Sequence, residues 1–144
     1  MNKIVALFRT QIGKELKDSP SPAGLWLKPV LLHVEEGHLK AEFTIRKEMT
    51  NPAGMLHGGM ITLIADEMIG ATIATLDLPD FYPSVNLYTD FLSGAKEGKK
   101  VIAEAQIIRK GKNIINTECK IYNPETKQLI AKSQSNNIKL STGK

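Results

Sequence analysis

One segment of this chain is apolar around almost its whole helical circumference and yet carries two adjacent carboxylates at its centre. It spans residues 58–76 and reads GGMITLIADEMIGATIATL. At about 100° per residue it offers no polar face to water, so a helix here needs to be covered on every side. Asp66 and Glu67 make it unsuitable as a membrane span. We therefore expect the rest of the chain to pack around one buried helix.

Stretches typical of β-strands lie on both sides of this helix. Residues 25–34 and 39–45 precede it and are joined by a turn at Glu35-Glu36-Gly37. Groups of strands around a single helix predict an α+β fold with an antiparallel sheet. Four more such stretches follow the helix, at residues 82–92, 101–108, 114–122 and 129–138.

The amino-terminal residues predict an amphipathic helix from Ile4 to Leu16, which the sequence Ser19-Pro20-Ser21-Pro22 would end. Core packing is its expected role, and a membrane surface is the alternative. The segment lacks the features of a secretion signal, and the single Cys119 excludes an internal disulfide and a multi-cysteine zinc site. We expect a cytoplasmic protein of one domain, residues 1–144, with its core at about residues 25–139.

Positive charge is concentrated in the carboxyl-terminal third. Residues 1–95 contain 8 Lys and Arg against 11 Asp and Glu, a net charge of −3, whereas residues 96–144 contain 11 against 4, a net charge of +7. A basic segment favours an anionic partner, which can be nucleic acid, a membrane surface or a phosphate-bearing small molecule. A solvated lysine-rich surface explains the same charge without any partner.

The loop before the central helix brings polar groups to the helix start. It contains Asn51 and runs into His57-Gly58-Gly59. Free N–H groups at a helix amino terminus, left open by glycines, are suited to polarising a carbonyl oxygen. A helix cap is the alternative role for His57, and an Asx turn is the alternative for Asn51.

Asp66 is the stronger candidate for chemistry among the two carboxylates. It shares a helix face with Gly59 and Gly70, so that another backbone or a thin substrate can approach it closely. Glu67 lies about a quarter-turn away. A buried carboxylate usually has a partner or performs chemistry, because its burial is costly.

The run Asn51-x5-His57-Gly58-Gly59-x6-Asp66, with Ser84-Val85-Asn86 at the start of a strand and Arg109-Lys110-Gly111-Lys112 in a turn, resembles a known family. It is similar to the hotdog-fold acyl-CoA thioesterases of the phenylacetate-pathway and thioesterase-superfamily-member-2 type, over about residues 26–138. The resemblance implies a hotdog fold, in which an antiparallel sheet wraps a long central helix. It also implies a homodimer with two active sites at its interface, and commonly a homotetramer.

The same resemblance implies a role for each matching residue. The Gly58 backbone N–H would polarise the thioester carbonyl of an acyl-CoA, and His57 would position the loop or the thioester. Asp66 of the partner subunit would be the general base or the nucleophile. Asn51 would orient the water or the substrate, and Ser84 would hold the water or Asp66 from across the interface.

The resemblance also gives the basic segment a ligand. Arg109, Lys110 and Lys112 would contact the phosphates of coenzyme A, and Asn86 and Phe91 would lie near its pantetheine. Such hydrolysis requires no cofactor and no metal, and neither nucleic acid nor membrane insertion is expected.

Alternatives remain for both the function and the base. A non-catalytic acyl-CoA-binding protein would share the pocket, and so would a hotdog hydratase or dehydratase, although its Asp-x4-His pattern does not occur in this sequence. Glu67 remains an alternative base, because hotdog thioesterases of another branch use Glu near this place. A serine hydrolase is disfavoured because the sequence contains no G-x-S-x-G.

Overall fold

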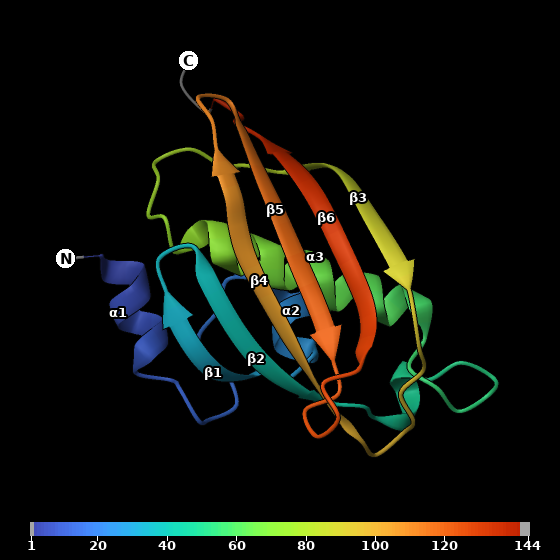
Figure 1. Cartoon of the computed structure of the whole chain (residues 1–144). Coiled ribbons are helices and arrows are strands. Elements are labelled where there is room, and N and C mark those ends of the chain that lie inside the picture. Colours follow the sequence, from blue (N-terminus) through green and yellow to red (C-terminus); the bar gives the residue numbers. More distant parts are fainter. Residues whose placement is uncertain (1, 142–144) are drawn as a thin grey trace.

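The computed structural model describes residues 2–141, which form one curved antiparallel sheet with a long helix, α3, against its concave side (Figure 1). The sheet order is β1-β2-β4-β5-β6-β3. This arrangement confirms the predicted α+β architecture. The strands are β1 (Val30–Glu35), β2 (His38–Thr44), β3 (Ser84–Phe91), β4 (Lys100–Lys110), β5 (Ile114–Tyr122) and β6 (Leu129–Ile138).

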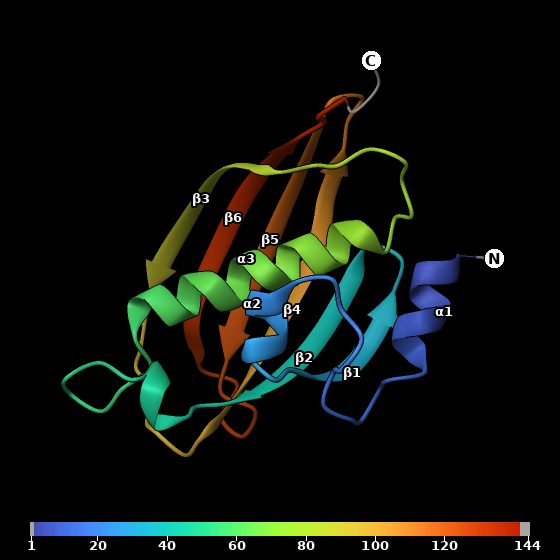
Figure 2. The ribbon, with the colours of Figure 1, turned by 180° about the vertical axis from the view of Figure 1, so that it is seen from behind.

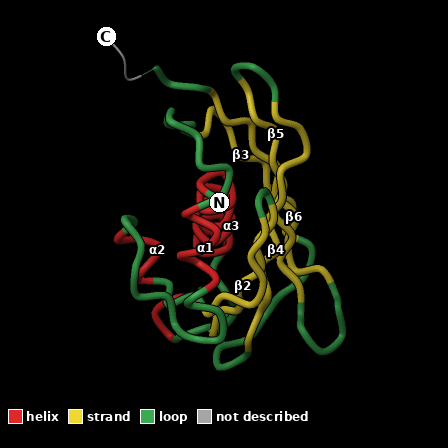
Figure 3. Tube along the Cα trace, turned by 90° about the vertical axis from the view of Figure 1, so that its left-hand side faces the viewer, coloured by secondary structure: helices red, strands yellow, loops and turns green. Residues whose placement is uncertain are grey.

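Helix α3 (Gly58–Ala74) follows the predicted segment but is covered on one side only. Its buried residues face the sheet, whereas Gly59, Asp66, Gly70 and Ala74 are exposed on the opposite side. The expectation of a helix covered all round is therefore wrong for a single chain. Figures 2 and 3 show why: the sheet lies on one side of the helix, and the short helix α2 with its flanking loops covers just part of the other side.

The core lies between α3 and the sheet. Strand residues alternate between buried and more exposed positions, as expected for a sheet with one covered face. Small side chains beneath the helix, such as Ala103, Ala105 and Cys119, are fully buried and let α3 approach the sheet closely. Larger side chains such as Phe43, Ile64 and Ile121 fill the remaining space.

The amino-terminal segment differs from the prediction. Helix α1 (Lys3–Arg9) ends well before Leu16, and a second short helix, α2 (Pro22–Trp26), occupies the first residues of the stretch predicted as a strand from Leu25. Ser21 caps α2 and Pro22 stands at its start, which is a strong local signal for helix initiation. Within residues 2–141, no helix is both long and apolar enough to cross a membrane.

Strand register determines which residues meet at each end of the sheet. Ser84 pairs with Asn137, and Ile114 pairs with Ile138, so the start of β3 lies at the same end as the β4–β5 turn. The β3–β4 loop lies at the other end, where the Ala95 carbonyl accepts the N–H of Leu56, two residues before α3. The start of α3 and the β4–β5 turn are thus about one strand length apart, roughly 30 Å.

Candidate active site

The loop before α3 is organised around Asn51. Its Oδ1 accepts hydrogen bonds from the N–H groups of Ala53 (2.9 Å) and Met55 (3.1 Å), and its own N–H donates to the Met55 carbonyl (2.8 Å). The side chain therefore closes an Asx-type turn, which is the alternative role that the sequence left open. Its Nδ2 amide makes no hydrogen bond to residues 2–141, so this group is available as a donor.

His57 caps α3 and leaves one N–H of the first turn unpaired. Its Nδ1 accepts from the Gly59 N–H (2.8 Å), and its carbonyl accepts from Met60 and Ile61. The Gly58 N–H is the remaining donor, and none of the described residues accepts it. This donor lies at the positive end of a helix of 17 residues.

The Phe91 ring packs directly against Gly58. A Cβ at position 58 would lie 3.2 Å from Phe91 Cε1, closer than ordinary packing allows. Phe91 is the last residue of β3 and is 57% exposed. The ring therefore forms a wall beside the free N–H, and glycine at position 58 leaves the approach to this N–H open.

Asp66 lies on the exposed face of α3 and is held by Ser84. The Ser84 hydroxyl donates to Asp66 Oδ1 (3.0 Å) and is itself within 3.2 Å of Asn137 Nδ2, a donor on β6. Both residues belong to the same chain, so the expectation that Ser84 holds Asp66 from across an interface is wrong in this respect. The contact arises because the loop after α3 runs back along the helix to the start of β3 (Figure 2), which places Ser84 beside Asp66.

Glu67 has a different environment from its neighbour. Its Oε1 accepts from the Ser21 hydroxyl (2.5 Å), and its Oε2 would lie 3.1 Å from a Cβ at Gly24. The amino-terminal segment therefore covers Glu67 and pairs it. This arrangement gives Glu67 a hydrogen-bond partner in the amino-terminal segment. Asp66 is the more exposed of the two carboxylates, although both line the same hollow.

Gly58 and Asp66 are too far apart to act together within one chain. They are eight residues apart on α3, which corresponds to about 12 Å along the helix axis. A carboxylate must lie within hydrogen-bond reach of its water or within contact distance of the carbonyl carbon. A thioester bound at the Gly58 N–H therefore cannot be attacked by Asp66 of the same chain.

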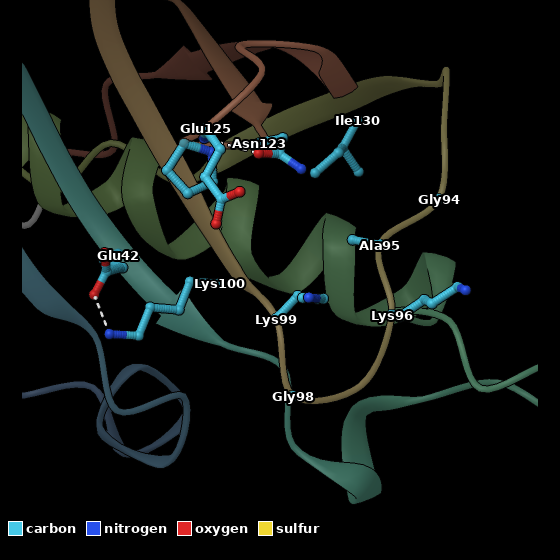
Figure 4. Close-up of a pocket in the computed structure, with 11 residues that line it drawn as sticks. Glu42, Gly94, Ala95, Lys96, Gly98, Lys99, Lys100, Asn123, Glu125 and Ile130 are labelled. Carbon is cyan, nitrogen blue, oxygen red and sulfur yellow. Dashed lines mark hydrogen bonds and ion pairs between the residues drawn. The ribbon is translucent and has the colours of Figure 1, made fainter.

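Two hollows lie at opposite ends of the sheet, and the first of them adjoins Asp66 and Ser84. One, of about 750 Å³, starts at Asp66 and Ser84 and extends along Gly70 toward Phe8 and Tyr82. The other, of about 640 Å³, lies at the opposite end of the sheet and is shown in Figure 4. Lys96, Lys99 and Lys100 surround it, and Lys100 pairs with Glu42 (3.4 Å).

Comparison with known proteins identifies the family. The model of the thioesterase superfamily matches residues 53–130. The chain belongs to this superfamily. Its members are thioester hydrolases, so the chain is an enzyme of this class.

Human acyl-coenzyme A thioesterase 13 is 29% identical over 109 residues, which cover 74% of this chain and 76% of the relative. Zebrafish thioesterase superfamily member 2 superposes with a TM-score of 0.78 and 23% identity over 97% of both chains. The E. coli PaaI protein from the phenylacetic acid degradation operon superposes with a TM-score of 0.75 and 21% identity, over 81% of this chain and 86% of that one. The fold of this thioesterase is thus the predicted hotdog fold.

The residues predicted to bind coenzyme A, apart from Phe91, lie away from Gly58 within one chain of this thioesterase. Asn86 is on the outer face of the sheet, where its Oδ1 accepts from the backbone N–H of Asn136 (3.1 Å). Arg109, Lys110 and Lys112 are exposed at the β4–β5 turn and form no ion pair within residues 2–141. These three basic residues lie at the same end of the sheet as Ser84.

Sequence reasoning missed three features of the thioesterase site. It did not predict the hydrogen bond from Ser21 to Glu67 or the one from Asn137 to Ser84. These partners are 46 and 53 positions apart in the sequence, and such contacts leave no local sequence signal. It also passed over the lysines at 96, 99 and 100, which follow the Ser93-Gly94 turn and lie nearer to the start of α3 than residues 109–112 do.

Proposed function

We propose that this thioesterase hydrolyses acyl-CoA thioesters to the free acid and coenzyme A, at two sites shared by the chains of a homodimer. The Gly58 N–H carries the proposal. Within residues 2–141 it has no acceptor, and it lies at a helix start beside the Phe91 ring and about 12 Å from Asp66 along the helix. The name of the human relative supports acyl-CoA as the substrate class.

The free edge of β3 is the proposed dimer contact. Val85 (62%), Tyr88 (66%) and Phe91 (57%) on this edge strand are largely exposed, and within residues 2–141 only β6 pairs with β3. Long edge strands with exposed apolar residues favour pairing with another chain. Two β3 strands that pair antiparallel about a two-fold axis would join the two sheets.

In such a pair the strands of the partner sheet run in the opposite direction. One end of the first sheet therefore lies next to the other end of the second sheet. The end with Asp66, Ser84 and the β4–β5 turn of one chain then faces the end with Gly58 and Phe91 of the other. Each site would contain the carbonyl-binding N–H of one subunit and the carboxylate of its partner. The reversal also brings residues 109–112 of that partner to the same site, although they are about one strand length from Gly58 within one chain.

The proposed reaction needs few groups. The thioester oxygen accepts the Gly58 N–H, which stabilises the negative charge that develops on the oxygen when the carbonyl carbon is attacked. Asp66 of the partner subunit takes a proton from water, whose oxygen adds to the carbonyl carbon. In the second form of the mechanism the carboxylate itself attacks, and water then hydrolyses the resulting mixed anhydride to release the acid and free Asp66. The carbon–sulfur bond then breaks and coenzyme A leaves as the thiolate.

The other residues position these groups. Ser84 donates to one Asp66 oxygen and leaves the second oxygen to bind the water. Asn51 shapes the loop through Oδ1 and offers its Nδ2 to the water or substrate, and His57 holds the helix start. The phosphates of coenzyme A would meet Arg109, Lys110 and Lys112, and its pantetheine would pass Phe91. A contact with Asn86 would require the ligand to reach the outer face of the sheet.

A thiol-release assay over a panel of acyl-CoA substrates tests this function. Asp66→Asn is expected to lower kcat by about 100-fold or more, because it removes the base. Glu67→Gln is the matched control and is expected to lose less than about tenfold, since Glu67 contacts Ser21. Burial raises the pKa of the Cys119 thiol, so the thiol of the folded protein should react little with the assay reagent and add little background to the measured thiol release.

The two variants separate the alternatives. If wild-type protein binds acyl-CoA but releases no thiol from any substrate, the chain is a binding protein and the hydrolytic proposal is wrong. If Glu67→Gln loses more activity than Asp66→Asn, the base lies one residue further along the helix.

A further inference from the structure

Two histidines and two carboxylates meet at the edge of the sheet that is farthest from β3. His33 and Glu35 lie two residues apart on β1, and Glu35 pairs directly with His38 across the hairpin. Gly37, with φ of 79°, allows the tight turn between them. The spacing His-x-Glu-x-x-His across a hairpin turn therefore brings all three side chains together, on the face of the sheet away from α3.

The nitrogen and oxygen atoms of this cluster are already close. One ligand atom from each of His33, Glu35 and His38 lies within 4.8 Å of the others, and the two imidazole rings are 4.9 Å apart. Glu104 on β4 adds a second carboxylate, with Oε2 at 2.6 Å from His38 Nε2. The cluster thus offers two imidazole nitrogens and two carboxylate groups.

One of these nitrogens is not satisfied by the protein. His33 Nε2 is buried and makes no hydrogen bond of acceptable geometry within residues 2–141, although Glu35 Oε1 is 2.9 Å away. A buried polar atom of this kind normally has a partner. A ligand that binds to the nitrogen lone pair and to the adjacent carboxylate would satisfy both groups.

We propose that His33, His38 and Glu35 bind a divalent transition-metal ion of the Zn²⁺ type, with Glu104 as a fourth ligand. Imidazole and carboxylate are the ligands that such ions accept in tetrahedral sites, with bonds of about 2.0–2.2 Å. Tetrahedral geometry requires neighbouring ligand atoms about 3.3 Å apart. Two nitrogen–oxygen pairs in the cluster are shorter than this (2.6 and 2.9 Å), so binding requires them to widen while the longer separations shorten. Rotation of Glu35, which is more than half exposed, and of the two partly exposed imidazoles would allow both changes.

The local charge favours a cation. Glu35 and Glu104 contribute two negative charges, and Lys40, whose Nζ is 3.9 Å from Glu104 Oε1, contributes one positive charge. Counting these contacting groups, the cluster is net negative when both histidines are neutral; Lys120, which is opposite Glu104 on β5, forms no ion pair with it. Mg²⁺ prefers six oxygen ligands and is not expected to bind.

The bound ion would have a structural role. It would connect β1, β2 and β4 at one edge of the sheet, whereas β3 and the proposed active site lie at the other edge. The proposal is therefore independent of the hydrolytic mechanism.

Metal binding to the tag-free, chelator-treated protein tests the proposal. We expect one Zn²⁺ per chain in a titration against a chromophoric chelator, and the visible absorption bands of tetrahedral Co²⁺ when Co²⁺ replaces it. His33→Ala, His38→Ala and Glu35→Gln should each weaken binding tenfold or more. His57→Ala is the matched control, because His57 is the third and last histidine of the chain.

Thermal unfolding gives a second measurement. Zn²⁺ should raise the Tm of wild-type protein but not that of His33→Ala, because an ion that binds only the folded site stabilises it. Wild-type binding by His33→Ala, loss of binding in His57→Ala, or the absence of a stoichiometric site would each overturn the proposal. Thioesterase activity of His38→Ala should equal that of wild type.

Discussion

Asp66 and Glu67 are adjacent in the sequence but differ in what contacts them. Glu67 accepts a hydrogen bond from Ser21 beneath the amino-terminal segment, whereas Asp66 faces outward with only its Oδ1 bonded, to Ser84, within residues 2–141. We therefore expect Asp66, the more exposed carboxylate, to be the group that takes a proton from the attacking water in the proposed site. The glycines on its helix face predicted this preference for Asp66, whereas the contact between Glu67 and Ser21 could not be predicted.

Substitution of Gly58 by alanine, which adds one methyl group, tests whether a substrate approaches the Gly58 N–H. We expect Gly58→Ala to lower kcat/KM by roughly tenfold or more, because its Cβ would push against Phe91 and narrow the approach to the N–H. The loss should be smaller than for Asp66→Asn, since the N–H itself remains. Thiol-release kinetics measure the effect, and thermal unfolding shows whether the variant is folded. Wild-type kcat/KM would show that nothing approaches Gly58 during the reaction.

Helix α3 illustrates what could be predicted at the scale of elements. Its hydrophobic sequence predicted its position, but not that one face would remain uncovered by its own chain. Apolar residues along a helix face indicate that this face is buried, but they do not indicate whether the same chain or a second chain covers it. The exposed face of Gly59, Asp66 and Gly70 is therefore consistent with a second copy.

Strand prediction succeeded where alternation and turn signals agreed. Strands β5 and β6 have the predicted bounds, since Lys110-Gly111-Lys112 precedes β5 and Asn123-Pro124 separates it from β6. The prediction failed at Leu25, where an apolar sequence continued a strand pattern but the Ser21-Pro22 capping signal started a helical turn instead. The catalytic roles stay predictions, because they depend on contacts between two chains.

The β4–β5 turn gives a prediction at the same scale. Arg109→Ala and Lys112→Ala should raise KM several-fold for acyl-CoA, because each removes an attractive charge, and the effect should diminish at high salt. Neither change should alter KM for an acyl-pantetheine that lacks the phosphates. Steady-state kinetics with both substrates measure the difference, and an equal rise in KM for both would exclude phosphate recognition by this turn.

The whole molecule is expected to be at least a dimer. The distance of about 12 Å between Gly58 and Asp66 along one helix prevents both from acting on one thioester, and the exposed β3 edge supplies a surface for pairing. An antiparallel pair of β3 strands would bring opposite ends of the two sheets together. In the proposed arrangement the basic turn of the partner would lie near Gly58, although the two are about one strand length apart within a single chain.

Mixing two inactive variants tests the shared site most directly. Asp66→Asn and Asn51→Ala impair different halves of the proposed site, so each should be inactive alone. After verified subunit exchange at equal concentrations, half of the dimers are mixed and each has one intact site, so about one quarter of wild-type activity should return. No recovery of activity in the mixed dimers would contradict a site built from two chains.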